Sequence, residues 1–131
     1  MDIDKAHFGH IKLVVDDLEG SAGFYGEVCG MIELGRAEGV MNGRDGSEVM
    51  FAPTAEGGPM FVLVKFHDAP APQSADVLLG FTTADLEAFC ARVAAAGGRV
   101  TQQITSIPEH GVRAAFATDI EGNVLEVLQL L

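Results

Sequence analysis

The sequence has no tryptophan, a single tyrosine and only two cysteines in 131 residues. Two cysteines cannot form the disulfide framework of a small secreted domain, so we expect Cys29 and Cys90 to be free thiols, with a disulfide as the alternative. The acidic first residues lack the apolar stretch of a secretory signal, and no apolar run reaches membrane-spanning length. These absences favour a cytoplasmic protein that does not interact with a membrane.

Basic residues are also scarce, since 8 Lys and Arg face 19 Asp and Glu for a formal net charge of −11. The few basic residues are scattered, whereas binding to phosphate backbones requires them in clusters, so we expect no nucleic-acid partner. The same field disfavours polyanionic ligands and favours cationic small molecules. The simpler interpretation is that the charge maintains solubility.

The apolar periodicity predicts one order of elements twice along the chain. Gly30 and the pair Gly97-Gly98 end the two predicted helices, and Pro70 and Pro72 indicate an extended linker at 67–74. Segments 39–46 and 53–59 are predicted as turns. The first half is predicted as strand 7–15, helix 19–28 and strands 31–37, 47–52 and 60–66. The second half is predicted as strand 77–81, a helix from 83 or 84 to 96, and strands 99–104, 112–118 and 123–130.

This repeat predicts an α+β fold of two tandem βαβββ modules, residues 7–66 and 75–131, within one domain spanning 1–131. Each module alone would leave an apolar sheet face uncovered. We therefore expect the two to form a curled mixed sheet around a cleft, with the helices outside. Periodicity leaves open whether the modules pair within one chain or between two.

Two motifs lie near the ends of the chain. The first has a strand histidine, an acidic-Leu step, Ser-x-x-Phe-Tyr and a helix-ending glycine; the second is Asp-x-x-Gly-x-x-x-Glu, with Ile120 where proline is usual. Together they resemble the vicinal-oxygen-chelate superfamily of glyoxalases, bleomycin-resistance proteins and extradiol dioxygenases. The residues concerned are His10, Asp17, Leu18, Ser21, Phe24, Tyr25 and Gly30, then Asp119, Gly122 and Glu126.

The resemblance implies a site for one divalent ion, Zn, Ni, Fe or Mn, held by one residue from each of four strands. His10 and Glu126 match the first and last positions, and counting along the repeat puts Asp76 at the third. The fourth falls at Val62 or Leu63, neither of which binds metal. The implied metal ligands are therefore His10, Asp76 and Glu126, an incomplete set that metal-free members of the superfamily share.

Each of these residues also has a purely structural interpretation. His10 and Glu126 would satisfy one another as an ion pair in the cleft without any metal. Asp76 stands beside the predicted linker and is then simply solvated.

Further candidates would contact a small-molecule ligand rather than a metal. Alternation places Lys12 on the same strand face as His10. With no tryptophan, a platform for planar rings rests on phenylalanines. His110 lies in a predicted turn before a strand, and in the superfamily that turn lines the ligand cleft. The expected ligand-binding residues are Lys12, Phe51, Phe61, His110 and Phe116, with Phe66 as a further ring.

Two functions remain open from the sequence. One is a bleomycin-resistance-like protein that binds a small molecule with no obligatory metal. The other is a metal-dependent lyase, isomerase or dioxygenase acting on vicinal oxygens, with Glu126 as ligand or catalytic base. In either case the resemblance implies a homodimer.

Overall fold

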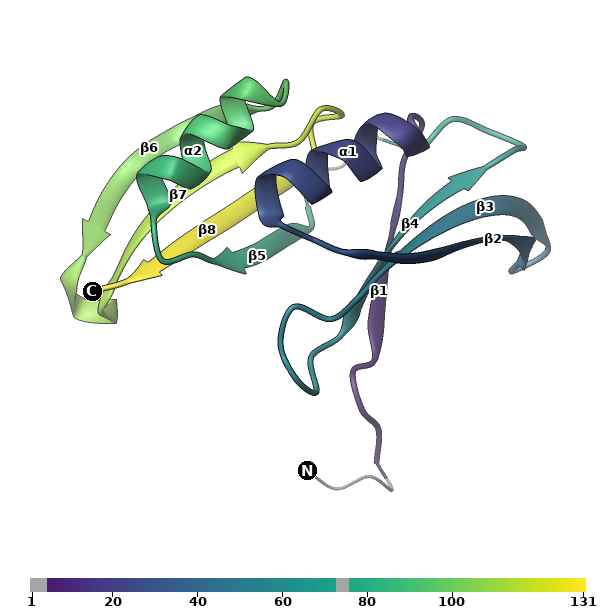
Figure 1. The fold of residues 1–131 in the computed structure, drawn as a ribbon, viewed down its shortest axis with the longest axis horizontal. Helices are drawn as coiled ribbons and strands as arrows, with labels where there is room; N and C mark the ends of the chain where they lie inside the picture. Colours follow the sequence, from purple (N-terminus) through teal and green to yellow (C-terminus); the bar gives the residue numbers. More distant parts are fainter. Residues whose placement is uncertain (1–4, 73–75) are drawn as a thin grey trace. The chain divides into compact units, whose positions relative to one another are not determined.

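The computed structural model describes residues 5–72 and 76–131. The predicted start of the second module, residue 75, and positions 73 and 74 of the predicted linker lie outside the described residues. The described residues form two four-stranded sheets and two α-helices, whose arrangement can be followed in Figure 1. The elements are β1 (His10–Val14), α1 (Leu18–Cys29), β2 (Glu33–Met41), β3 (Arg44–Phe51), β4 (Met60–Phe66), β5 (Leu78–Thr82), α2 (Leu86–Ala95), β6 (Arg99–Ile107), the 3-10 helix η1 (Pro108–His110), β7 (Val112–Thr118) and β8 (Val124–Leu130).

The two sheets have the same topology, which confirms the α+β class and the repeated order of elements. The first has the strand order β1-β4-β3-β2 and the second β5-β8-β7-β6. In each, the first strand of the module pairs in parallel with the last, and the remaining pairs are antiparallel. β4 and β7 have the bounds predicted from the sequence.

The β2–β3 hairpin is longer than the sequence analysis predicted. Residues 39–46 were expected to be a turn, but the strands continue to Met41 and Arg44, which are cross-strand partners. Only Asn42 and Gly43 form the connection, with φ of 52° and 75°. An Asn-Gly pair with both residues in the left-handed region is the most favoured two-residue hairpin turn, so this dipeptide was the available signal.

The chain forms two compact units that differ from the sequence repeat in one element. One unit contains β1 to β4, and the other contains β5 to β8, α2 and also α1 from Glu19 onward. The helix of the first module therefore packs in the unit of the second. Figure 1 shows α1 and α2 against the second sheet, and Arg92 of α2 donates from Nε to the Val28 carbonyl of α1 at 3.0 Å.

The contact that holds α1 in this unit joins the two motifs of the sequence analysis. Tyr25 donates from its hydroxyl to Asp119 Oδ2 at 2.7 Å, and both residues are buried, with exposed fractions of 0% and 3%. The other Asp119 oxygen accepts the backbone N–H groups of Glu121 and Asn123. A buried carboxylate requires such donors. The residues of the two motifs therefore form one buried, hydrogen-bonded contact that has a structural role.

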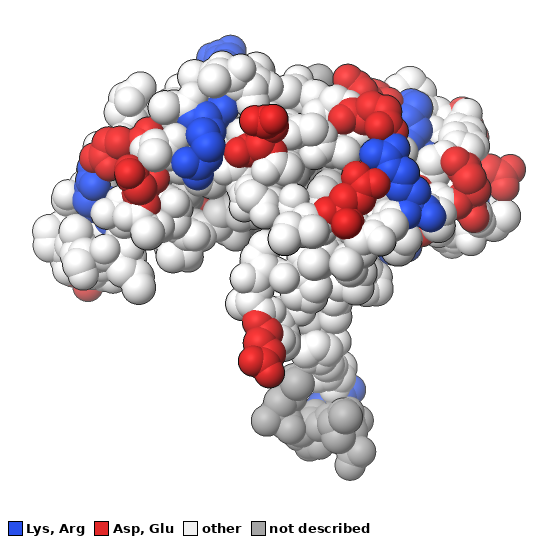
Figure 2. Space-filling view, viewed as in Figure 1, with Lys and Arg blue, Asp and Glu red and all other residues white. Residues whose placement is uncertain are grey.

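Acidic side chains are spread over the face shown in Figure 2, with Lys and Arg among them rather than gathered in a patch. Several of the basic residues are engaged in ion pairs, such as Arg113 with Glu87 and Arg44 with Asp68. Across residues 5–72 and 76–131, no helix has the length and hydropathy needed to cross a membrane.

Candidate functional site

In the first sheet, His10 and Lys12 lie on one face, as strand alternation predicted. His10 pairs in register with Met60, and Lys12 pairs with Val62. Val62 therefore shares the face of His10, whereas Leu63 points to the opposite face. The register thus resolves the choice that the sequence left open, and Val62 is the β4 residue beside which a ligand of His10 would sit.

Phe51 and Phe61, predicted as ligand contacts, do not share that face. They are cross-strand partners in register with Ile11, and their ring centroids lie 6.2 Å apart. Both rings are buried. Because side chains alternate along a strand, the odd-numbered residues of β4 point to the face of the sheet that does not carry His10 and Lys12. The two rings therefore pack against each other on the face away from His10.

In the second sheet, Glu126 alternates with the fully buried Leu125 and Val127 and therefore lies on the other face of β8. Its register partners are Gly80 on one side and Phe116 on the other. Val124 and Leu128 share this face by alternation, as predicted. Gly80 leaves open space beside the carboxylate, since a Cβ there would meet no atom within 4 Å. Glu126 and Phe116, both predicted site residues, are therefore neighbours.

The matching topologies identify equivalent positions in the two modules. His10 is the first residue of β1, and the first residue of β5 is Leu78. Glu126 is the third residue of β8, and the third residue of β4 is Val62. A four-ligand site that used equivalent positions of both modules would draw on these four residues. Two of them are apolar.

Asp76 and His110 lie outside the strands. Asp76 is exposed, two residues before β5 begins, so the residue at the strand position of His10 is Leu78 rather than Asp76. His110 ends η1 and is exposed, directly before Gly111 in the left-handed region. Within residues 5–72 and 76–131 there is no group of three His, Cys, Asp or Glu residues arranged to hold a metal ion.

Lys12 has a partner that sequence reasoning missed. Its ammonium forms an ion pair with Glu48 of β3, and Nζ also lies 3.5 Å from Met41 Sδ of β2. Glu48 pairs in register with Val64, on the face that carries Lys12 and His10. Only cross-strand register brings positions 12 and 48 together, because they are 36 residues apart in sequence.

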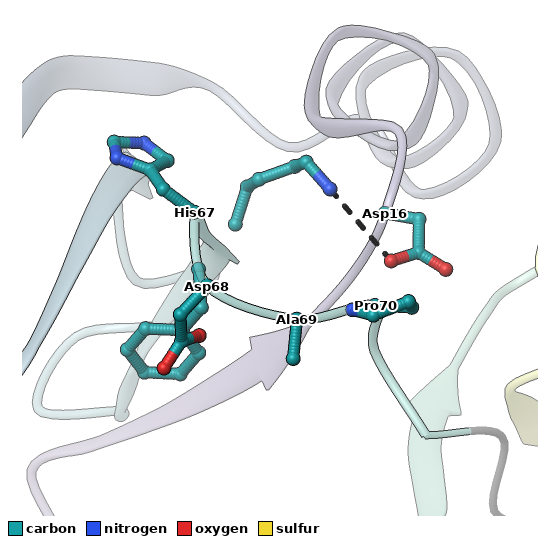
Figure 3. A pocket seen from close by; sticks show the side chains of 7 residues that line it. Asp16, His67, Asp68, Ala69 and Pro70 are labelled. Carbon is teal, nitrogen blue, oxygen red and sulfur yellow. Dashed lines mark ion pairs between the residues drawn. The ribbon is translucent and has the colours of Figure 1, made fainter.

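An open pocket of about 470 Å³ lies where the chain leaves β4. The Asp16 carboxylate forms an ion pair with the Lys65 ammonium at 3.7 Å, which the dashed line in Figure 3 marks. Asp16 also accepts the Ala71 N–H, and Asp68 accepts a bidentate contact from Arg44, which lowers the pKa of the Asp68 carboxyl. These polar groups fix the course of the chain after β4, so we assign the pocket a structural role.

The cysteines and the tyrosine are not poised for nucleophilic chemistry. Cys29 and Cys90 are both free. Burial raises the pKa of the Cys29 thiol to about 12 and also raises that of Cys90. Burial, followed by the charge of Asp119, raises the pKa of Tyr25 far above its ordinary value. A thiol or phenol that stays protonated is a poor nucleophile.

A sequence profile of the Glyoxalase/Bleomycin resistance protein/Dioxygenase superfamily matches residues 7–127. The chain belongs to this superfamily. The match covers the first βαβββ module and the second as far as Val127 in β8, and it includes His10, Val62, Leu78 and Glu126.

Several solved structures are similar to this chain in fold. A glyoxalase family protein from Bacillus cereus is 17% identical, with a TM-score of 0.82 over 95% of this chain and 94% of its own. A glyoxalase/bleomycin resistance protein/dioxygenase domain from Frankia sp. EAN1pec is 23% identical, with a TM-score of 0.74 and coverages of 93% and 90%. TnmS3, an antibiotic binding protein from Streptomyces sp. CB03234, is 28% identical, with a TM-score of 0.73 and coverages of 96% and 97%. No curated protein matches the chain.

Proposed function

We propose that this member of the superfamily binds a small molecule without an obligatory metal ion. The observation that carries the proposal is the pair of apolar residues, Val62 and Leu78, at two of the four equivalent strand positions. A hydrocarbon side chain has no lone pair to offer an ion. His10 and Glu126 alone would hold a divalent ion weakly, because affinity depends on ligand number and type.

The similarity to TnmS3 supports the same proposal, because that protein is described as antibiotic binding. We further propose that the protein acts in the cytoplasm, in agreement with its two free cysteines. The ligand contacts proposed here are Lys12 in the first sheet and Phe116 in the second, with His110 as a further contact.

A second function keeps support from His10 and Glu126 themselves. If these residues bind a Zn, Ni, Fe or Mn ion, the protein would be a lyase, isomerase or dioxygenase acting on vicinal oxygens. The ion would supply Lewis acidity, and Glu126 would serve as ligand or base. Histidine and carboxylate are suitable donors for such an ion.

Metal content and one restored ligand distinguish the two functions. We expect protein purified without added metal to contain far less than one equivalent of these ions by elemental analysis. The metal content of the His10→Ala variant should be the same as that of the parent. Val62→Glu should then raise Ni²⁺ affinity at least about tenfold in calorimetry, because it adds a carboxylate on the His10 face. Val62→Gln controls for the change in shape, and Leu63→Glu places the same carboxylate on the opposite face.

One equivalent of metal that is lost in His10→Ala would overturn the metal-free proposal and favour the enzyme. Equal Ni²⁺ affinity in the parent, Val62→Glu and Val62→Gln would show that His10 and Glu126 form no metal site. That result would strengthen the binding function.

A further inference from the structure

Three of the five methionines lie on the sheet face that carries Lys12. We call this the methionine face, and its residues include Lys12, Met41, Glu48, Met50, Met60 and Val62. His10 and Arg44 also lie on it by strand alternation. Met60 is the register partner of His10, and Met50 is that of Val62. Met41 reaches the Lys12 ammonium through its sulfur. All three methionines are half-buried, so part of each side chain remains accessible to a ligand.

Glycines give two of these methionines room to lie along the sheet. The Met50 methyl lies 3.8 Å from the point where a Cβ of Gly35 would stand, and the Met41 methyl lies 2.9 Å from the corresponding point at Gly46. A side chain at Gly46 would displace Met41. Methionine is unbranched and polarisable, and its sulfur contacts aromatic rings favourably. The part of this surface that Met41 and Met50 form is therefore apolar and adaptable.

Lys12 and Arg44 are both cations of this face. Arg44 is engaged in a bidentate contact with Asp68 and lies over the Phe66 ring, whereas the Lys12 ammonium reaches a methionine. Lys12 is 37% exposed at its side chain, and Glu48, its ion-pair partner, is 15% exposed. An ammonium has three N–H donors, and here one is directed at the Met41 thioether. A thioether sulfur is a weak acceptor, so a ligand oxygen at the same position would form the stronger hydrogen bond.

The charges around Lys12 determine whether the ligand oxygen that accepts its hydrogen bond is neutral or charged. Glu48 already balances the ammonium, and the chain carries a net charge of −11, so a second carboxylate at this point would be repelled. A cationic ligand would have to compete with Lys12 for Glu48. A neutral carbonyl oxygen meets neither obstacle.

We propose that the methionine face binds neutral aromatic ketones, with the ring on Met41 and Met50 and the carbonyl oxygen accepting a hydrogen bond from Lys12 Nζ. This inference rests on the proposed small-molecule-binding function and names its ligand class. Lys12 is then the residue that determines specificity, and the methionines adapt to the shape of the ring system.

The test compares 1-indanone with indane, which has the same bicyclic skeleton without the carbonyl oxygen. Protein labelled with ¹³C at the methionine methyl groups is titrated with each compound and followed by NMR. We expect 1-indanone to shift the Met41 and Met50 methyl signals saturably and to bind about tenfold more tightly than indane, the ratio that corresponds to one net hydrogen bond to a charged group. Met41→Leu and Met50→Leu assign the signals.

Lys12→Met should abolish the preference for 1-indanone over indane. Lys65→Met is the matched control, because it removes the same charge from the opposite face of the same sheet and should keep the preference. A preference that survives Lys12→Met, or equal affinities for the two compounds in the parent, would overturn the assignment of Lys12.

The outcomes separate this inference from the proposed function. Saturable binding of 1-indanone with unchanged Met41 and Met50 signals overturns the inference and leaves the binding function standing. Absence of saturable shifts with either compound overturns this ligand class. The metal measurements above test the function independently.

Discussion

Tyr25 and Asp119 connect two sequence motifs that lie far apart along the chain. One comes from the Ser-x-x-Phe-Tyr motif and the other from the Asp-x-x-Gly turn, and they meet in a buried hydrogen bond of 2.7 Å. Ser21 and Glu121 make a second, longer contact between the same segments, at 3.4 Å. The recurrence of these residue types in the superfamily motifs thus has a structural reason that does not involve the ligand.

We predict that Tyr25→Phe lowers the free energy of unfolding at pH 7 by about 1.5–3 kcal/mol, because a buried hydrogen bond to a charged group is lost. The variant should also lose less stability in alkali. The pKa of Tyr25 is raised in the folded state, so its stabilisation is complete below the ordinary tyrosine pKa of about 10 and declines as the pH rises above it.

Urea unfolding at pH 7 and at about pH 10.5 measures both effects. Cys29, whose pKa is raised to about 12, contributes a similar alkaline loss in parent and variant alike. An equal decline for Tyr25→Phe and parent between the two pH values would contradict the role assigned to Tyr25.

Single residues also mark the limit of what the sequence could predict about the site. Alternation placed Lys12 with His10, and Glu126 with Val124 and Leu128, because period two is visible within one strand. The choice between Val62 and Leu63 depended on how β4 aligns with β1. The partnership of Lys12 with Glu48 depended on a third strand. Register of this kind is not encoded in any one segment.

At the scale of elements, strands with continuous apolar runs were predictable and their connections less so. β4 was predicted correctly because MFVLVKF is bounded by a glycine-rich turn. The β2–β3 hairpin was predicted too short because its strands are rich in charged residues and glycine, which mask the strand pattern. The packing of α1 in the second unit had no signal in periodicity, since a helix presents the same apolar face to either sheet.

The junction between α2 and β6 depends on a close approach at Gly98. A Cβ at this position would stand 2.3 Å from the Thr118 carbonyl oxygen and 2.9 Å from Phe24 of α1. We predict that Gly98→Ala destabilises the protein by about 3 kcal/mol, because a backbone oxygen cannot move aside as a flexible side chain would.

Gly23→Ala is the matched control. Gly23 is exposed on α1 with nothing within 4 Å of its would-be Cβ, so alanine should stabilise the helix by about 0.5–1 kcal/mol. Thermal and urea unfolding of both variants measure the difference. A Gly98→Ala protein as stable as the parent would show that the three segments do not meet at this point.

At the scale of the whole molecule, the superfamily resemblance predicts a homodimer. Exposed apolar residues at strand edges and ends, such as Ile32, Val40 and Leu130, are available for such an association. We expect sedimentation equilibrium at micromolar concentration to give twice the chain mass of 13.8 kDa. Measurement at high and low salt separates association from the self-repulsion of a chain with a net charge of −11. A monomer at both salt concentrations would contradict the prediction.

The position of α1 also has a consequence for synthesis on the ribosome. Tyr25 leaves the exit tunnel before Asp119, which lies 94 residues further on and must be translated before the two can meet. During that interval the buried side of the helix, with Phe24, Tyr25 and Val28, has no completed sheet of its unit to cover it. The nascent chain therefore exposes an apolar helix until the segment that contains Asp119 has been translated, and this is the segment on which a chaperone would act.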